Sequence, residues 1–162
     1  MESVARHLKD HALTLGPTDE AALFGRSAFN RYYYSAFLLT KLYLLPVLPA
    51  LPEKHAGIPE FLQGSVAREL NRRKAQARRV DDHASIQLAH NARLAAVELA
   101  ALLKTGYSAR VVADYHPETP LDFYDRGFKL NEVRVSEAET WPHKSRQLAV
   151  MIAGAMRQTD GY

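Results

Sequence analysis

The stretch RSAFNRYYYSAFLLTKLYLL, residues 26–45, decides the fold of this chain. It carries apolar residues on more than one helical face, and a helix of that kind is normally surrounded by other helices. The spacing predicts two stripes, one of Phe24, Ala28, Tyr32, Ser35, Leu39, Leu42 and Leu45, and one of Leu23, Ser27, Tyr34, Phe37 and Leu38. We therefore expect a central helix of an all-α bundle, with both stripes covered by neighbouring helices.

Polar groups interrupt the middle of this helix, where Asn30, Arg31 and three consecutive tyrosines follow one another. A buried polar group needs a hydrogen-bond partner or a route to water. Two interpretations stay open at this point. The stretch is either a core helix whose tyrosine hydroxyls reach the rim, or a helix that supplies polar groups to a functional site.

Length and composition bound the class of protein. The chain has 162 residues, which suits one domain with a sizeable core, and we expect a single domain over residues 1–162 with its core at about 18–158. It has no cysteine, which excludes disulfides and thiolate metal sites. The N-terminus has no apolar signal segment, and Lys41 and Pro46 interrupt the most apolar run. We expect a cytoplasmic protein with no membrane contact.

Helix-start and helix-stop signals predict the elements around the central stretch. We expect helices over residues 2–15, 18–45, 65–79 and 83–114, and a last one from residue 136 to beyond 156. Thr18 and Asp82 are the expected N-caps, and Ser136 with Glu139 has the pattern of a capping box. The sum is an up-and-down bundle of four to five helices.

Three further signals concern breaks in this pattern. Gly106 is expected to end or kink the helix that contains it, and Pro142 to kink the last helix. Residues 129–135 alternate weakly between apolar and polar, which fits a short extended segment.

A basic run lies in the third predicted helix. Six cations fall between residues 68 and 79, namely Arg68, Arg72, Arg73, Lys74, Arg78 and Arg79. Such a run is either a solvated helix face or a surface that binds phosphates in a salt-sensitive manner. For the second interpretation the candidates are Arg72, Arg73, Arg78 and Arg79. No aromatic residue is interleaved, so the run has no base-stacking platform.

The segment RVVADYH, residues 110–116, is the best candidate for chemistry. Glycine-rich phosphate loops, HExxH and nucleophile elbows are absent from the sequence, and the histidines are scattered, so we expect no metal and no cofactor. Arg110 and Asp114 are four apart on a helix and are expected to pair. One interpretation is a structural pair that closes the helix, with His116 as a loop residue.

The other interpretation of this segment is catalytic. An arginine that holds a phosphate and a histidine that takes the proton of a ribose 2′-OH suffice to cleave RNA without a metal. Arg110 and His116 converge only if the helix ends near Tyr115, which Pro117 favours. Tyr115 itself is a poor base at neutral pH, because its unperturbed pKa is about 10.

Three blocks of this sequence resemble HEPN domains. The segment SAFNRYYYSAFLL, residues 27–39, resembles their RxYYxAF helix, and HAGIPEF, residues 55–61, looks like the turn that follows it in one branch. The segment RVVADYH resembles the RxxADY helix end of the same branch, and the last helix looks like the closing helix of the domain. The blocks occur in the same order and cover most of the chain.

The resemblance implies a HEPN-like bundle that commonly forms a homodimer. Many members cleave RNA without a metal at a cleft between the two copies, often as toxins or defence components, using an arginine and a histidine separated by four to six residues. Others are non-catalytic modules, and a small nucleotidyltransferase-fold protein is a frequent partner. Arg110 matches the motif arginine. Tyr115 occupies the position that usually holds the histidine, and His116 follows one residue later.

Three hypotheses follow. The first is a HEPN-like domain that binds RNA or a nucleotide at a dimer cleft and acts as a metal-independent RNase. In it, Arg110 and His116 are catalytic, and the site is lined by Asn30, Arg31, Tyr33, Asp114 and Tyr115. The second is a non-catalytic module that binds a partner such as a nucleotidyltransferase-fold protein. The third is a simple basic nucleic-acid binder that uses residues 68–79.

Overall fold

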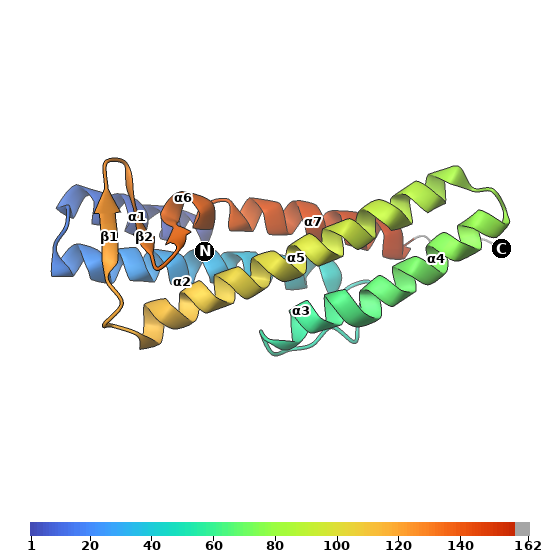
Figure 1. The fold of residues 1–162 in the computed structure, drawn as a ribbon, viewed down its shortest axis with the longest axis horizontal. Helices are drawn as coiled ribbons and strands as arrows, with labels where there is room; N and C mark the ends of the chain where they lie inside the picture. Colours follow the sequence, from blue (N-terminus) through green and yellow to red (C-terminus); the bar gives the residue numbers. More distant parts are fainter. Residues whose placement is uncertain (158–162) are drawn as a thin grey trace. The chain divides into compact units, whose positions relative to one another are not determined.

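The computed structural model describes residues 1–157, and within them the chain is an all-α helical bundle with one small sheet (Figure 1). The helices are α1 (Glu2–Leu15), α2 (Asp19–Leu44), α3 (Gly57–Phe61), the π-helix η1 (Leu62–Val66), α4 (Ala67–Arg79), α5 (His83–Tyr115), α6 (Val135–Ala138) and α7 (Trp141–Arg157). The strands are β1 (Leu121–Tyr124), β2 (Gly127–Leu130) and β3 (Val133–Arg134). The all-α class predicted from residues 26–45 is confirmed.

The chain divides into two compact units, which are described separately. Unit 1 consists of Met1–Phe37 and Thr105–His143, and unit 2 of Leu38–Lys104 and the chain from Lys144 onward. The helices α2, α5 and α7 each contribute residues to both units. The expectation of one domain over the whole chain stays a prediction.

The two predicted N-caps are confirmed. The Thr18 hydroxyl oxygen accepts a hydrogen bond of 3.1 Å from the Ala21 amide, and the Asp82 carboxylate accepts one of 3.0 Å from the Ser85 amide. Both bonds satisfy amides that have no partner within the helix itself. Gly16, with φ of 68°, stands directly after α1, so the first helix ends where the sequence predicts.

The core of unit 1 forms around the first half of α2. Its buried side chains include Ala28, Phe29, Tyr32 and Tyr33 on α2, and Phe128 and Trp141 from the sheet and the start of α7. Gly106 is also buried, and a Cβ atom there would lie 2.8 Å from the Tyr33 ring. The helix α5 continues past this glycine to Tyr115, so the alternative that Gly106 ends the helix is wrong. Its role is to let Tyr33 pack closely against α5.

The second predicted stripe of α2 is covered only in part within the described residues, since Phe37 is buried and Tyr34 half-buried. Leu23 is 67% exposed, and Ser27 and Leu38 are exposed as well. Phe29 and Tyr33, one helical turn apart, are buried instead. The rest of the prediction failed because it assigned burial from residue type, whereas α2 is covered on the Phe29 side and faces solvent along the Leu23–Ser27 edge.

A three-stranded antiparallel sheet lies between Leu121 and Arg134, where the sequence pattern predicted the structure least clearly. The strand β1 pairs with β2, and β2 pairs with β3 through Leu130 and Val133. Asn131, with φ of 54°, lies in the turn between β2 and β3. The single extended segment predicted at residues 129–135 is therefore only partly right, because the turn at residues 131–132 folds it into the β2–β3 hairpin and Val135 already begins α6.

The start of the last helix differs from the prediction. Residues 135–138 form the separate short helix α6, whose N-cap is Arg134 with no side-chain bond, so the capping box from Ser136 is wrong. The helix α7 begins at Trp141, which places Pro142 in its first turn. Proline fits that position because its missing N–H has no partner there, so the predicted kink is not needed.

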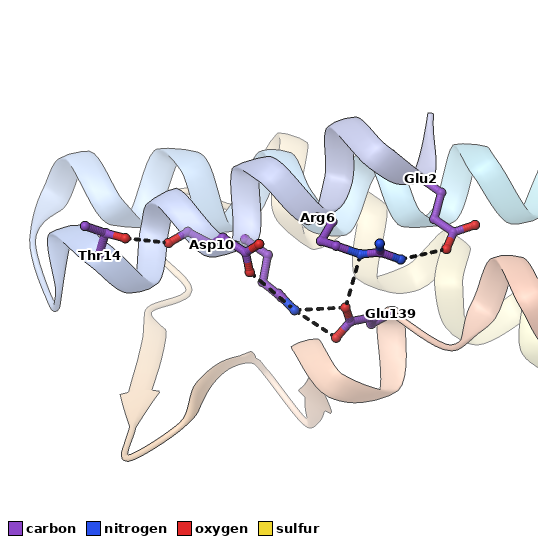
Figure 2. Close-up of polar contacts among 6 residues, drawn as sticks. Glu2, Arg6, Asp10, Thr14 and Glu139 are labelled. Atoms are coloured by element: carbon purple, nitrogen blue, oxygen red, sulfur yellow. Dashed lines mark hydrogen bonds and ion pairs between the residues drawn. The ribbon is translucent and has the colours of Figure 1, made fainter.

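An ionic cluster links α1 to the end of α6 in unit 1 (Figure 2). The Lys9 ammonium donates to both carboxylate oxygens of Glu139 at 2.9 Å, and Arg6 lies 3.8 Å from the same carboxylate. Arg6 also pairs with Glu2 at 3.2 Å. The side chain of Lys9 is largely buried, so this contact fixes α1 as well as neutralising charge.

The core of unit 2 is rich in alanine and leucine. Val66 and Leu70 face inward as predicted, and α5 contributes Ala92, Ala95, Ala96, Leu99 and Leu103. Small side chains let helices approach closely. Within residues 1–157, none of the helices is both long enough and apolar enough to cross a bilayer.

Candidate functional site

Arg26 fixes the C-terminal end of α5 against α2 in unit 1. Its guanidinium donates hydrogen bonds to the backbone carbonyls of five residues, which are Val112, Ala113, His116, Pro117 and Thr119. The last carbonyls of a helix have no partner within it, and a cation there also complements the helix dipole. The end of α5, where the sequence predicts a site, is therefore held by a side chain of the central helix.

A polar chain of three residues lies beside this contact. The Asn30 amide donates to both oxygens of Asp114, at 2.8 and 3.0 Å. The Arg110 Nε atom lies 2.8 Å from the Asp114 carboxylate, which confirms the pair predicted from their spacing. The Nε–H group is poorly aligned with the oxygen, so this contact is an ion pair more than a hydrogen bond. Asn30 and Asp114 thus hold Arg110 in one place.

Two tyrosine rings flank the Arg110 guanidinium. Its central carbon lies 5.9 Å from the ring centre of Tyr34 and 5.3 Å from that of Tyr115. The Arg110 side chain is only 19% exposed. Burial lowers the pKa of Arg110, but the Asp114 carboxylate and the Tyr34 hydroxyl raise it by more than burial lowers it. The pKa of Arg110 therefore lies above its ordinary value. Arg110 is a permanent, largely buried cation.

Tyr33 supports this cluster from the core. It is 1% exposed, and its ring contacts Tyr34 and Tyr107 with centres 5.8 and 5.9 Å away. Burial is the main cause that raises the pKa of Tyr33. Tyr33 was expected to line the site, but it is buried in the core, and Tyr34, which was not predicted as a lining residue, contacts Arg110 instead.

His116 follows the end of α5, which stops at Tyr115 as predicted. Its side chain is 49% exposed, and its Nδ1 atom lies 2.9 Å from a carboxylate oxygen of Glu118. A hydrogen bond at its own backbone and the bond from His116 lower the pKa of Glu118. When Nδ1 donates to Glu118, Nε2 remains as an acceptor. Among the contacts of residues 1–157, none joins His116 to Arg110.

A surface hollow of about 330 Å³ opens beside the polar chain. Its walls come from α2 and the end of α5, and its lining residues are Leu23, Arg26, Ser27, Asn30, Arg31, Ala113 and Asp114. Arg31 is exposed at this hollow. Of the predicted lining residues, Asn30, Arg31 and Asp114 therefore meet at one place.

The arginines of the predicted basic face lie in unit 2 and divide into two pairs. Arg72 and Arg73 contact the Glu69 carboxylate at 2.9 and 2.8 Å, and Arg73 also donates to the Ala155 carbonyl at 3.1 Å. The hydrogen bond from Arg72 is the largest cause that lowers the pKa of Glu69, to about 2. The second pair, Arg78 and Arg79, is exposed at the end of α4.

Three contributors to the site in unit 1 escaped the sequence analysis, namely Arg26, Tyr34 and Glu118. The contacts of Arg26 join residues that are 86 to 93 positions apart in the sequence, so no short sequence pattern predicts them. An arginine within an apolar helix is nevertheless a signal, because a buried guanidinium requires several acceptors. The contact of Glu118 with His116 could have been predicted from the sequence, since the two residues are only two positions apart.

Comparisons with known proteins give no match from which a role for this site could be taken. No family model, curated protein or solved structure matches this chain. Within residues 1–157, no group of three or more histidine, aspartate or glutamate side chains could hold a metal ion.

Proposed function

We propose that this chain is a HEPN-like helical domain that binds RNA or a nucleotide at the hollow of unit 1 and cleaves RNA without a metal at the adjacent end of α5. One observation carries the proposal. The end of α5 combines a permanent cation, Arg110, with an exposed histidine whose Nδ1 is held by the Glu118 carboxylate. A phosphate-binding cation and an oriented imidazole are the two groups that this reaction needs.

In the proposed reaction His116 acts as the general base. Its Nε2 atom takes the proton of a ribose 2′-OH, and the 2′-oxygen attacks the adjacent phosphorus. The bond between phosphorus and the 5′-oxygen of the next nucleotide breaks, the 5′-oxygen takes a proton from water and leaves as a hydroxyl group, and a 2′,3′-cyclic phosphate remains. General acid–base catalysis of this kind typically contributes about 10²- to 10⁴-fold in rate. Glu118 holds the imidazole and stabilises its protonated form.

The cations of the site have separate tasks in this proposal. Arg110 is held by Asp114, whose carboxylate offsets much of its charge, so in this proposal Arg110 acts on the phosphate by short-range hydrogen bonding rather than by a long-range field. Arg31 is exposed at the hollow and is available to bind a phosphate oxygen directly. The family resemblance adds a homodimer with the site near its two-fold axis, and a role as a toxin or defence component.

The proposal is tested by RNA cleavage in the presence of EDTA. We expect wild type to release products with 2′,3′-cyclic phosphate ends, and both His116→Ala and Arg110→Ala to lose at least about 10²-fold in rate. His143→Ala is the matched control, because His143 is another exposed histidine of unit 1. The proposal fails if wild type cleaves no RNA, or if both site variants cleave as fast as wild type.

One observation favours a second candidate, a non-catalytic module that binds a partner protein. Arg110 is enclosed by Asp114, Tyr34 and Tyr115, which is also how a purely structural arginine is held. Leu23 is exposed at the rim of the hollow and would suit a protein contact. The resemblance implies a nucleotidyltransferase-fold partner. Loss of such a complex in Leu23→Asp, with no RNA binding by wild type, would favour this candidate.

A further inference from the structure

We propose that Tyr115 is a platform on which an unpaired nucleobase stacks, so that the site takes single-stranded rather than duplex RNA. This inference rests on the proposed function, because it names the class of RNA that the site accepts and one side chain that binds it.

The position of Tyr115 differs from that of most aromatic side chains in unit 1. Phe29, Tyr32, Tyr33 and Trp141 are almost fully buried, whereas Tyr115 is 64% exposed at the last position of α5. Within residues 1–157, its ring contact is with the Arg110 guanidinium at 5.3 Å. Most of the remaining ring surface therefore faces water, at the same helix end as the candidate catalytic residues.

The contact with Arg110 prepares this ring to bind. Arg110 is held by Asp114, which is held in turn by Asn30. A ring that rests on a fixed group loses less conformational freedom when a ligand stacks on it. Every nucleobase has a face that can stack on such a ring, whatever its sequence.

The neighbouring groups complete a site for a single strand. His116 is the next residue, so its Cα atom lies about 3.8 Å from that of Tyr115. In this proposal the ribose of a base stacked on Tyr115 lies toward the imidazole. In a duplex the base faces are covered by their neighbours, so this contact requires an unpaired base. The basic helix α4 has no interleaved aromatic residue and cannot supply it.

The test compares three RNA probes of about 12 nucleotides by fluorescence anisotropy. The probes are a single strand, a duplex of the same sequence, and an abasic strand that keeps the phosphates; all carry 2′-O-methyl groups to prevent cleavage. We expect wild type to prefer the single strand over both others. Tyr115→Leu should weaken binding of the intact single strand by about 5- to 150-fold, and leave binding of the abasic strand unchanged.

Two variants separate stacking from folding. Tyr115→Phe keeps the ring and should bind like wild type, which shows that the position tolerates substitution. Tyr124→Leu removes another exposed tyrosine of unit 1, on β1, and should have no effect on binding. Far-UV circular dichroism checks that each variant is folded.

The outcomes distinguish this inference from the proposed function. If wild type binds the single strand and Tyr115→Leu binds it equally well, stacking on Tyr115 is refuted and the proposed function stands. A loss that is equal for intact and abasic strands also refutes stacking, because the abasic strand has no base to stack. If wild type binds none of the probes, the proposed function fails and this inference fails with it.

Discussion

Arg26 is the single residue on which the geometry of the candidate site depends most. It joins α2 to the last turn of α5 and to the loop that follows, through five backbone carbonyls, of which those of Val112 and His116 also accept a backbone amide. The Asn30–Asp114 contact lies one helical turn further along α2. Arg26 therefore positions the backbone beside Asp114 and at His116.

Replacing Arg26 by Met should lower the free energy of unfolding by about 1–3 kcal/mol, because it leaves several carbonyls without a donor. Arg31→Met is the matched control, since Arg31 lies on the same helix but is exposed, and a change within about 0.5 kcal/mol is expected there. Urea denaturation followed by circular dichroism measures both. Equal stability of the two variants would contradict the capping role of Arg26.

The helix α4 carries two groups of arginines that differ in their contacts. Arg72 and Arg73 are paired with Glu69, whereas Arg78 and Arg79 at its C-terminal end are exposed to solvent. In the first turns of α4, Glu69 accepts hydrogen bonds from Arg72 and Arg73. Arg73 also donates a hydrogen bond to the Ala155 carbonyl of α7. This cluster of Glu69, Arg72 and Arg73 therefore ties α4 to α7 within unit 2. Of the four candidate arginines, Arg78 and Arg79 are the better placed to meet a polyanion.

The pH dependence of this cluster follows from Glu69. Its pKa in the folded state is lowered to about 2, below its value of about 4.3 in an unfolded chain. The stabilisation is therefore fully present above the unfolded pKa, and is lost as the pH falls toward 2. Glu69→Gln should cost about 0.5–1 kcal/mol at pH 7 and nearly nothing at pH 2. Denaturation of both proteins at several pH values checks this; a constant difference would contradict it.

For the whole molecule, binding to RNA should depend on salt more than on sequence. The net charge is only +3, so the attraction depends on where the cations lie rather than on their sum. The exposed candidate cations are Arg31 at the hollow in unit 1 and, considered separately, Arg78 and Arg79 at the end of α4 in unit 2. Each phosphate contact releases counterions, so affinity falls as salt rises.

Removing Arg79 should reduce this salt dependence. We expect Arg79→Ala to lower the slope of log Kd against log salt by about 1, and to weaken binding to all sequences alike. Arg126→Ala removes an equally exposed arginine from the β1–β2 turn of unit 1, and should leave the slope unchanged. Anisotropy titrations at four salt concentrations measure both slopes. An unchanged slope in Arg79→Ala would exclude α4 from the interface.

The predictions from sequence succeeded where the physics is local. Thr18 and Asp82 cap helices through residues three positions away, and Arg110 meets Asp114 across one turn. The contacts that assemble the site are not local, since Asn30 and Asp114 are 84 residues apart. Residue type alone also could not tell that Leu23 is exposed while Tyr33 is buried, because burial depends on which face of α2 the other elements cover.

The capping box at Ser136 failed for a different reason. Its pattern is short, and it competed with a second helix start at Trp141, where Pro142 fits the first turn. A chain of two helices separated by a turn has the same apolar spacing as one longer helix over so few residues. The sequence pattern therefore could not separate α6 from α7.

The link between α1 and Glu139 makes the attachment of the first helix sensitive to its ionic surroundings. Lys9 and Arg6 both contact this carboxylate, and only two alanines of α1 are fully buried, Ala5 and Ala12. Few large side chains of α1 are fully buried, so its attachment depends on the exposed Arg6 pair and the part-buried Lys9 pair, of which salt weakens the exposed one more. Raising the salt concentration should therefore expose the peptide bonds of α1 to proteases before those of α2.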